Sequence, residues 1–92
     1  MSPQPSVSPA PESIVMYTTD WCPDCWRAKT VMKAMKVDFT EVNITHDADA
    51  ADLVVRLNRG NRSVPTIVFP DGSVLTEPPT TTLVAKLNAL AN

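Results

Sequence analysis

A chain of 92 residues allows one domain and little more. Hydrophobic residues make up 43% of it and charged residues 20%, which is ordinary for a globular domain, and the formal net charge is -2. This balance favours neither a nucleic-acid partner nor a basic membrane anchor, and no apolar run approaches the length that crosses a bilayer.

The beginning of the chain differs in composition from the rest. Residues 1–12 carry four prolines, three serines and no lysine or arginine. A secretory signal would need a basic start followed by an apolar stretch, and neither is present. We therefore expect a disordered Pro/Ser-rich tail over residues 1–12, a cytoplasmic protein, and one folded domain over residues 13–92.

The first half of the folded region predicts a strand, a helix and a second strand. Residues 14–17 form a continuous apolar run, which is typical of a strand buried on both faces. A loop follows, and Pro23 suits the first position of a helix. Apolar residues at helical spacing give this helix a core face, namely Ala28, Val31, Met32 and Met35. Residues 38–43 indicate the second strand.

The second half predicts a helix, a hairpin and a final helix. Asp47 is a suitable N-cap for an amphipathic helix, which ends near Gly60, a residue that can adopt the left-handed conformation of a helix end. Residues 66–69 and 73–76 indicate two strands joined by the turn at residues 70–72. The last helix follows two prolines and has its apolar face at Leu83, Val84, Leu87 and Leu90.

The predicted order is therefore β-α-β-α-β-β-α, an α/β arrangement. Its first half is a right-handed parallel unit, and its second half adds an antiparallel hairpin and a covering helix. This order is that of the minimal thioredoxin fold, a four-stranded mixed sheet flanked by helices.

The two cysteines of the chain stand at the predicted start of the first helix. Unpaired N–H groups and the helix dipole there favour an anion, which lowers the pKa of Cys22 toward the thiolate, the nucleophilic form. Cys25 lies one turn further on nearly the same face, so it can attack Cys22 in a mixed disulfide. The pattern predicts thiol–disulfide chemistry with no metal. A structural disulfide, zinc shared across a dimer and a pair of inert cysteines remain alternatives.

Two motifs resemble a known family. Residues 22–29, Cys-Pro-Asp-Cys-Trp-Arg-Ala-Lys, resemble the glutaredoxin pattern C-P-x-C-x-x-A-K, and residues 63–65, Ser-Val-Pro, resemble that family's T-V-P. Residues 17–22 and 61–76 are most similar to the mycoredoxin-type branch, which handles mixed disulfides with a bacterial low-molecular-weight thiol other than glutathione. The resemblance implies an oxidoreductase whose partners are proteins carrying mixed disulfides and a thiol–disulfide reductase. It also implies a cis Pro65 that faces the cysteines.

The chain departs from glutathione-using members at two places. Thr19 stands where they carry a lysine, and Gly72 is followed by Ser73 and Val74 instead of a second glycine and acidic residues. We therefore expect a mycothiol-like or bacillithiol-like co-substrate more than glutathione. Because Trp-Cys-Pro-Asp-Cys also occurs in thioredoxin-related proteins, a thioredoxin-like or ribonucleotide-reductase-type electron donor, recharged by a thioredoxin reductase, remains the alternative. A third alternative is iron–sulfur binding between two subunits, which Pro23 disfavours in this family.

Four residues around the motifs are candidates for substrate binding. Trp21 offers a rigid aromatic contact beside the nucleophile. The backbone of Val64, exposed by the cis Pro65 that the resemblance implies, could pair with an extended substrate. Arg62 could bind a carboxylate of the co-substrate.

Three further side chains have expected roles other than a clear contact with substrate. Asp24 places a negative charge near Cys22 and should raise the pKa of that thiol. Trp26 is as suited to packing against a neighbouring element as to contacting a substrate. His46 is far from the cysteines in the sequence and is interpreted as a surface residue without a role.

We expect the protein to be a monomer.

Overall fold

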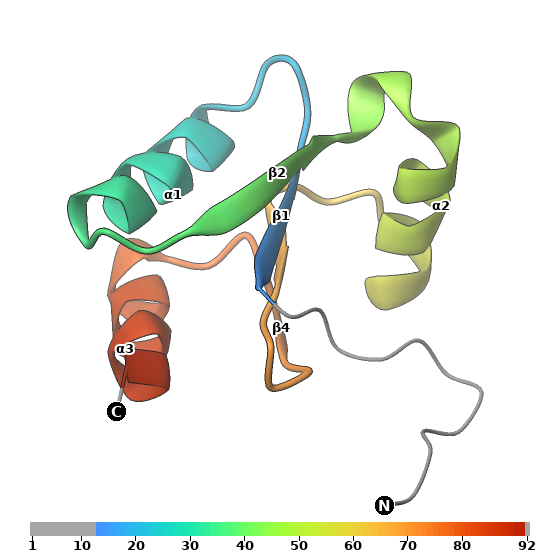
Figure 1. Ribbon diagram of the computed structural model, residues 1–92. Helices are drawn as coiled ribbons and strands as arrows, with labels where there is room; N and C mark the ends of the chain where they lie inside the picture. Colours follow the sequence, from blue (N-terminus) through green and yellow to red (C-terminus); the bar gives the residue numbers. More distant parts are fainter. Residues whose placement is uncertain (1–12, 92) are drawn as a thin grey trace, which may run out of the picture.

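The computed structural model describes residues 13–91, so the tail predicted over residues 1–12 lies outside the described part. The elements follow one another as β1 (Ile14–Thr18), α1 (Pro23–Ala34), β2 (Phe39–Asn43), the 3-10 helix η1 (Ile44–His46), α2 (Ala48–Leu57), β3 (Thr66–Val68), β4 (Val74–Thr76) and α3 (Thr80–Ala91) (Figure 1). This is the predicted order with η1 added. None of the helices within residues 13–91 has the length and apolar character needed to span a membrane.

The four strands form one mixed sheet in the order β2-β1-β3-β4. β1 runs parallel to β2 and antiparallel to β3, and β3 and β4 form the predicted antiparallel hairpin. Figure 1 shows α1 and α3 on one side of this sheet and α2 on the other. The fold predicted from the sequence is thereby confirmed.

Side chains alternate between the two faces of the sheet and divide the interior into two clusters. The larger one joins the sheet to α1 and α3 through Ile14, Met16, Ala28, Met32, Ile67, Phe69, Leu83 and Leu87. The smaller one packs α2 and η1 against the other face through Ile44, Ala51 and Val54, with Tyr17, Ala50 and Val64 at its margin. The two clusters hold β1 between them, and β1 ends directly before the loop that carries the cysteines.

The ends of α2 confirm one prediction and refine another. The Asp47 carboxylate accepts a hydrogen bond from the backbone N–H of Ala50 at 3.0 Å, so Asp47 is the N-cap, as predicted. At the other end the left-handed residue directly after the C-cap is Arg59, with φ 57°, and Gly60 follows it with φ 105°. The helix ends one residue earlier than the glycine suggests, because its last carbonyls accept from the N–H groups of Arg59 and Gly60.

Candidate active site

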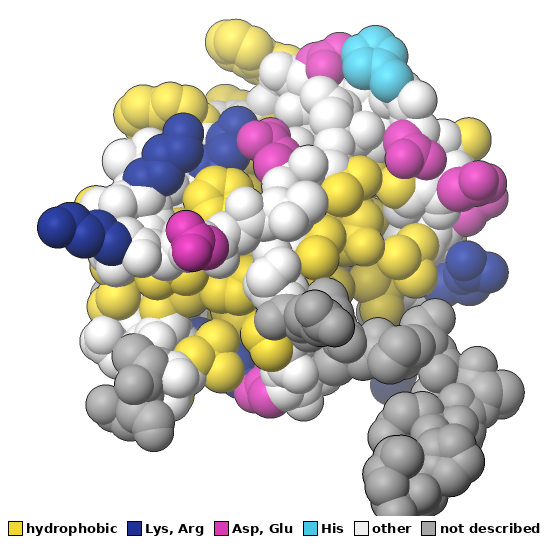
Figure 2. All heavy atoms as spheres, viewed as in Figure 1, with side chains coloured by type: hydrophobic (Ala, Val, Ile, Leu, Met, Phe, Trp, Pro, Cys, Tyr) yellow, Lys and Arg dark blue, Asp and Glu magenta, His cyan; other side chains and the backbone are white. Residues whose placement is uncertain are grey.

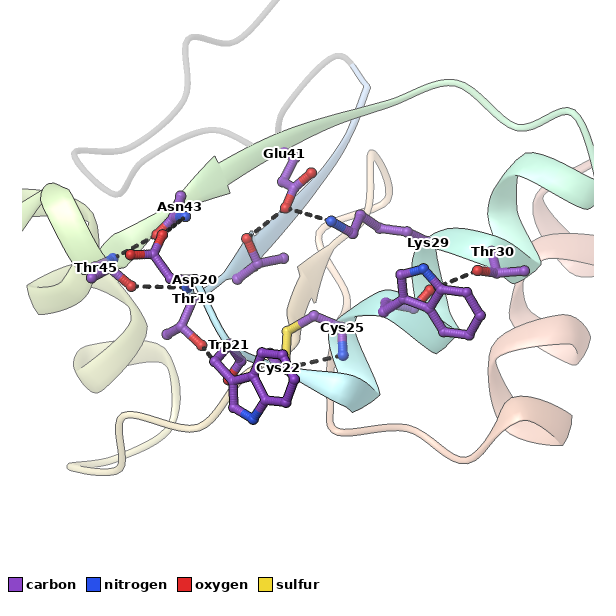
Figure 3. Close-up of polar contacts among 12 residues, drawn as sticks. Thr19, Asp20, Trp21, Cys22, Cys25, Lys29, Thr30, Glu41, Asn43 and Thr45 are labelled. Atoms are coloured by element: carbon purple, nitrogen blue, oxygen red, sulfur yellow. Dashed lines mark hydrogen bonds and ion pairs between the residues drawn. A yellow bond between two sulfur atoms is a disulfide. The ribbon is translucent and has the colours of Figure 1, made fainter.

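The cysteine pair occupies the start of α1. Cys22 is the N-cap, and its sulfur accepts a hydrogen bond from the backbone N–H of Cys25 at 3.0 Å. The two sulfurs are joined in a disulfide, with the Cα atoms 5.1 Å apart (Figure 3). Cys22 is half-buried, whereas Cys25 is only 2% exposed. A reactant from solvent therefore meets the sulfur of Cys22 first.

A pocket of about 350 Å³ opens beside this pair. Its lining residues are Thr19, Asp20, Trp21, Cys22, Pro23, Cys25, Trp26 and Lys29. The two tryptophans are strongly exposed, at 86% for Trp21 and 68% for Trp26. The sequence left the place of Trp26 open, and the structure puts it at this pocket. Two exposed indole surfaces beside a sulfur suit the binding of a partner molecule.

Asp20, two residues before Cys22, ties the loop to η1. One oxygen of its carboxylate accepts from the Asn43 side-chain amide at 2.6 Å, and the other lies 3.0 Å from His46 Nε2. The backbone N–H of Asp20 donates to the Thr45 hydroxyl at 3.0 Å (Figure 3). These contacts fix the loop that carries the nucleophile candidate.

The role of His46 in this contact was not predicted from the sequence, because 26 positions separate it from Asp20. The register of the sheet explains the contact. β1 and β2 are parallel and end together, with Thr18 opposite Asn43. The segments that follow the two strands therefore meet at one edge of the sheet, which is the general place for sites in such sheets. The pair of parallel strands was the sequence signal that could have placed His46 here.

A second polar cluster links α1 to β2. One oxygen of the Glu41 carboxylate accepts from the Thr18 hydroxyl at 2.8 Å and from Lys29 Nζ at 3.0 Å. Thr18, predicted in the loop, is the last residue of β1 and is fully buried. Burial by itself raises the pKa of Glu41, but the hydrogen bonds from Thr18 and Lys29 outweigh it and lower that pKa below its ordinary value. Glu41 is thus an anion that holds Lys29 in place.

Asp24 lies in the first turn of α1 and is exposed. Its carboxylate accepts from the Arg27 guanidinium at 2.6 Å. The side chains of this pair are 49% and 56% exposed for Asp24 and Arg27. The negative charge near Cys22 is therefore shared with a cation and open to solvent.

The loop before β3 contains the remaining candidates. The Val64–Pro65 peptide bond is cis, as the family resemblance implied. Val64 packs against the smaller core cluster and Pro65 is buried. The exposed Arg62 donates to the backbone carbonyl of Ile44 at 3.5 Å. None of these loop residues is among those that line the pocket, so their contact with a substrate stays a prediction.

Comparison with known proteins places these features in a family. Residues 14–74 match the model of the glutaredoxin family. A protein of Mycobacterium tuberculosis named as a glutaredoxin is 44% identical over 79 residues, covering 86% of this chain and 94% of the relative. Mycoredoxin 1 of Corynebacterium glutamicum is 34% identical over 80 residues, covering 86% and 98%. The crystal structure of the thioredoxin-like protein BC3987 superposes with a TM-score of 0.70 at 29% identity, covering 78% of this chain and 96% of that one.

Proposed function

Because this chain belongs to the glutaredoxin family, we propose that it reduces mixed disulfides between proteins and a low-molecular-weight thiol, with Cys22 as the attacking residue. The chain is a thiol–disulfide oxidoreductase of the glutaredoxin type. One observation carries the assignment of roles. The half-buried Cys22 sulfur caps α1 and accepts an N–H hydrogen bond, while its partner Cys25 is buried. A sulfur in that place is favoured as a thiolate and is the one that a substrate reaches.

The first step is an exchange at the mixed disulfide. The Cys22 thiolate attacks the sulfur that belongs to the low-molecular-weight thiol, and a new disulfide joins that sulfur to Cys22. The bond to the client protein breaks, and the client's sulfur leaves as a thiolate that takes a proton from solvent. The helix start stabilises the attacking thiolate, and Trp21 supplies an apolar contact for the incoming group.

Two routes return the enzyme to its reduced form. On the one-cysteine route a second molecule of the thiol attacks the adduct, releases a symmetric disulfide and frees Cys22. On the two-cysteine route Cys25 displaces the bound thiol and leaves the Cys22–Cys25 disulfide, which a thiol–disulfide reductase opens. The position of the two cysteines one helical turn apart, with Cα atoms 5.1 Å apart, supports the second route.

The co-substrate class follows from the departures within the family. Thr19 lines the pocket at the position where glutathione-using members carry a lysine. This position therefore supplies no cation to pair with a carboxylate of glutathione. The similarity to mycoredoxin 1 supports a mycothiol-like or bacillithiol-like thiol in its place. Among the other candidates, Val64 offers backbone for an extended client segment. Arg62 would have to release the Ile44 carbonyl before it could bind a carboxylate.

The test is a comparison of thiols. The oxidised protein is incubated with mycothiol, bacillithiol or glutathione, each with its own reductase and a protein carrying the matching mixed disulfide, while NADPH consumption is followed. We expect turnover with mycothiol or bacillithiol to exceed turnover with glutathione. Thr19→Lys should raise the glutathione rate, because it restores the family's cation. Equal or faster turnover of the parent with glutathione would contradict this thiol class.

A second candidate function is that of a protein electron donor recharged by a thioredoxin reductase. The similarity to the thioredoxin-like protein BC3987 and the adjacent, joined sulfurs favour it. A further arm of the same assay separates the two. With thioredoxin reductase, NADPH and a protein disulfide, but no small thiol, rapid NADPH consumption would favour this second function over the first.

A further inference from the structure

We propose that the Lys29 ammonium activates the buried thiol of Cys25, so that Cys25 displaces the thiol held on Cys22. This inference rests on the proposed function and concerns its two-cysteine route. It assigns Lys29 as the positioning residue for the second exchange, a role separate from the activation of Cys22 by the helix start.

Cys25 has a specific difficulty as a nucleophile. Only the thiolate attacks a disulfide, yet burial away from water disfavours the charged form of a thiol. Cys25 is 2% exposed, and its backbone N–H is already donated to the sulfur of Cys22. A nearby positive charge would offset the cost of ionising this buried group.

Lys29 lies where such a charge is needed. It follows Cys25 by four residues on α1, so the two side chains are neighbours on one helix face, with Cβ atoms about 5–6 Å apart. Both line the pocket, and the Lys29 side chain is only 26% exposed. Lys29 Nζ donates a hydrogen bond to the Glu41 carboxylate, which also accepts one from the hydroxyl of the buried Thr18. Figure 3 shows the Lys29 side chain running from α1 toward Glu41 on β2.

The other charges around Cys25 do not replace Lys29. Among the residues that line the pocket, Lys29 is the sole cation and Asp20 the sole anion. Asp20 is hydrogen-bonded to Asn43 and lies 3.0 Å from His46 Nε2. Elsewhere within residues 13–91, Arg27 pairs with Asp24, Lys86 of α3 pairs with Asp71, Arg62 reaches the Ile44 carbonyl, and Tyr17 of β1 packs in the smaller cluster. Glu41 opposes the thiolate, but two cations, Lys29 and the more distant Lys33, both act on Glu41.

In this second exchange Cys25 gives its proton to solvent, and its sulfur attacks the sulfur of Cys22. The Cys22–Cys25 bond forms while the bond from Cys22 to the small thiol breaks. That thiol leaves as a thiolate and takes a proton from solvent, so the cysteine pair is oxidised and the small thiol is reduced. Lys29 acts before the attack, by favouring the ionised form of Cys25.

Stopped-flow absorbance resolves this step. The reduced full chain is mixed with 4,4′-dithiodipyridine, a neutral disulfide whose thiol product absorbs. The first release reports the attack by Cys22 and depends on reagent concentration. The second release reports displacement by Cys25 and does not depend on reagent concentration. In Lys29→Met we expect the second phase to slow by about three- to tenfold at neutral pH, with the first phase nearly unchanged.

Two comparisons separate charge from structure. Lys29→Arg should restore the second phase, and the pH midpoint of that phase should rise only in Lys29→Met. Lys36→Met removes the same charge from an exposed position beyond the end of α1 and should leave both phases unchanged. A normal second phase in Lys29→Met, a slow phase without the pH shift, or equal slowing in Lys36→Met would overturn the role of Lys29. Loss of the first phase in the parent protein would instead overturn the proposed function. If Lys29→Met does not fold, Lys29→Gln provides the same readout.

Discussion

Asp24 and Arg27 set the charge around the first turn of α1. Their ion pair is 2.6 Å long, and both side chains are about half exposed. Pairs of this kind contribute little to stability, since solvent screens them. The charge of Asp24 nevertheless lies two residues from Cys22, whose ionisation the proposed mechanism requires. The effect of this pair should therefore appear in the reactivity of Cys22 more than in the stability of the fold.

Replacing Asp24 with Asn tests that effect. Removing the carboxylate should lower the pKa of the reduced Cys22 thiol by about one pH unit or less, since solvent and Arg27 weaken the interaction. A more stable thiolate stabilises the reduced form, so the redox potential should become less negative. The thiolate's ultraviolet absorbance against pH and equilibration with a thiol redox buffer measure the two quantities.

Two further variants give this prediction its control. Arg27→Gln should shift the pKa of Cys22 upward, because it leaves the Asp24 charge without its cation. Asp38→Asn, an exposed aspartate beyond the far end of α1, should change neither quantity. A higher Cys22 pKa in Asp24→Asn would mean that Asp24 acts through a hydrogen bond and not through its charge.

The Asp71 carboxylate links the turn of the β3–β4 hairpin to α3 through an ion pair with Lys86. Asp71, in the turn, accepts from the Ser73 backbone N–H at 2.9 Å and from its hydroxyl at 2.6 Å, and it pairs with Lys86 of α3. Lys86 Nζ also lies 5.3 Å from the centre of the Phe69 ring. The hydrogen bonds from Lys86 and Ser73 hold the pKa of Asp71 well below its ordinary value.

This shift gives a pH dependence of stability. A carboxyl group with a lowered folded-state pKa stabilises the protein above its unfolded pKa, about 4, and loses that contribution as pH falls through the lower folded value. Asp71→Asn should therefore unfold at lower urea concentration than the parent at neutral pH. The gap between the two should shrink as the pH is lowered below about 4. Asp38→Asn serves as control, and a gap that is constant with pH would contradict the ion-pair account.

Most elements could be predicted from periodicity and end signals, and the exceptions have local causes. η1 has no apolar period of its own, because it is a single turn that begins where the Asn43 side chain accepts from the Thr45 N–H. The left-handed residues after α1 and α2 are Lys36 and Arg59, which no residue preference would select. In both places the hydrogen bonds that close the helix impose the conformation.

The residues of the candidate site fall into two groups: those in contiguous motifs and those that join segments distant in the sequence. The cysteine pair, Asp24 and the cis Pro65 lie in contiguous motifs, so they could be found before the fold was known. The contacts of Asp20 with His46 and of Lys29 with Glu41 join segments that are distant in the sequence. They depend on the parallel pairing of β1 with β2, and only the assembled sheet brings them together.

The surface that Figure 2 presents carries both acidic and basic side chains, and the formal net charge of the chain is only -2. The exposed Trp21 and Trp26 stand out against this mixed surface. Recognition of a mixed disulfide should therefore depend on contacts beside Cys22 and little on long-range attraction, so that turnover changes little with salt.

The claim that Cys22 takes the small thiol from the client protein is tested most directly by intact-protein mass spectrometry. Reduced Cys25→Ser is mixed with a protein carrying a mycothiol mixed disulfide, and both masses are followed. The client should lose one thiol while the variant gains it on Cys22, and the adduct should persist, since no second cysteine can displace it. Cys22→Ser should leave the client unchanged. Removal of the thiol from the client by Cys22→Ser at the rate of the parent would contradict the account.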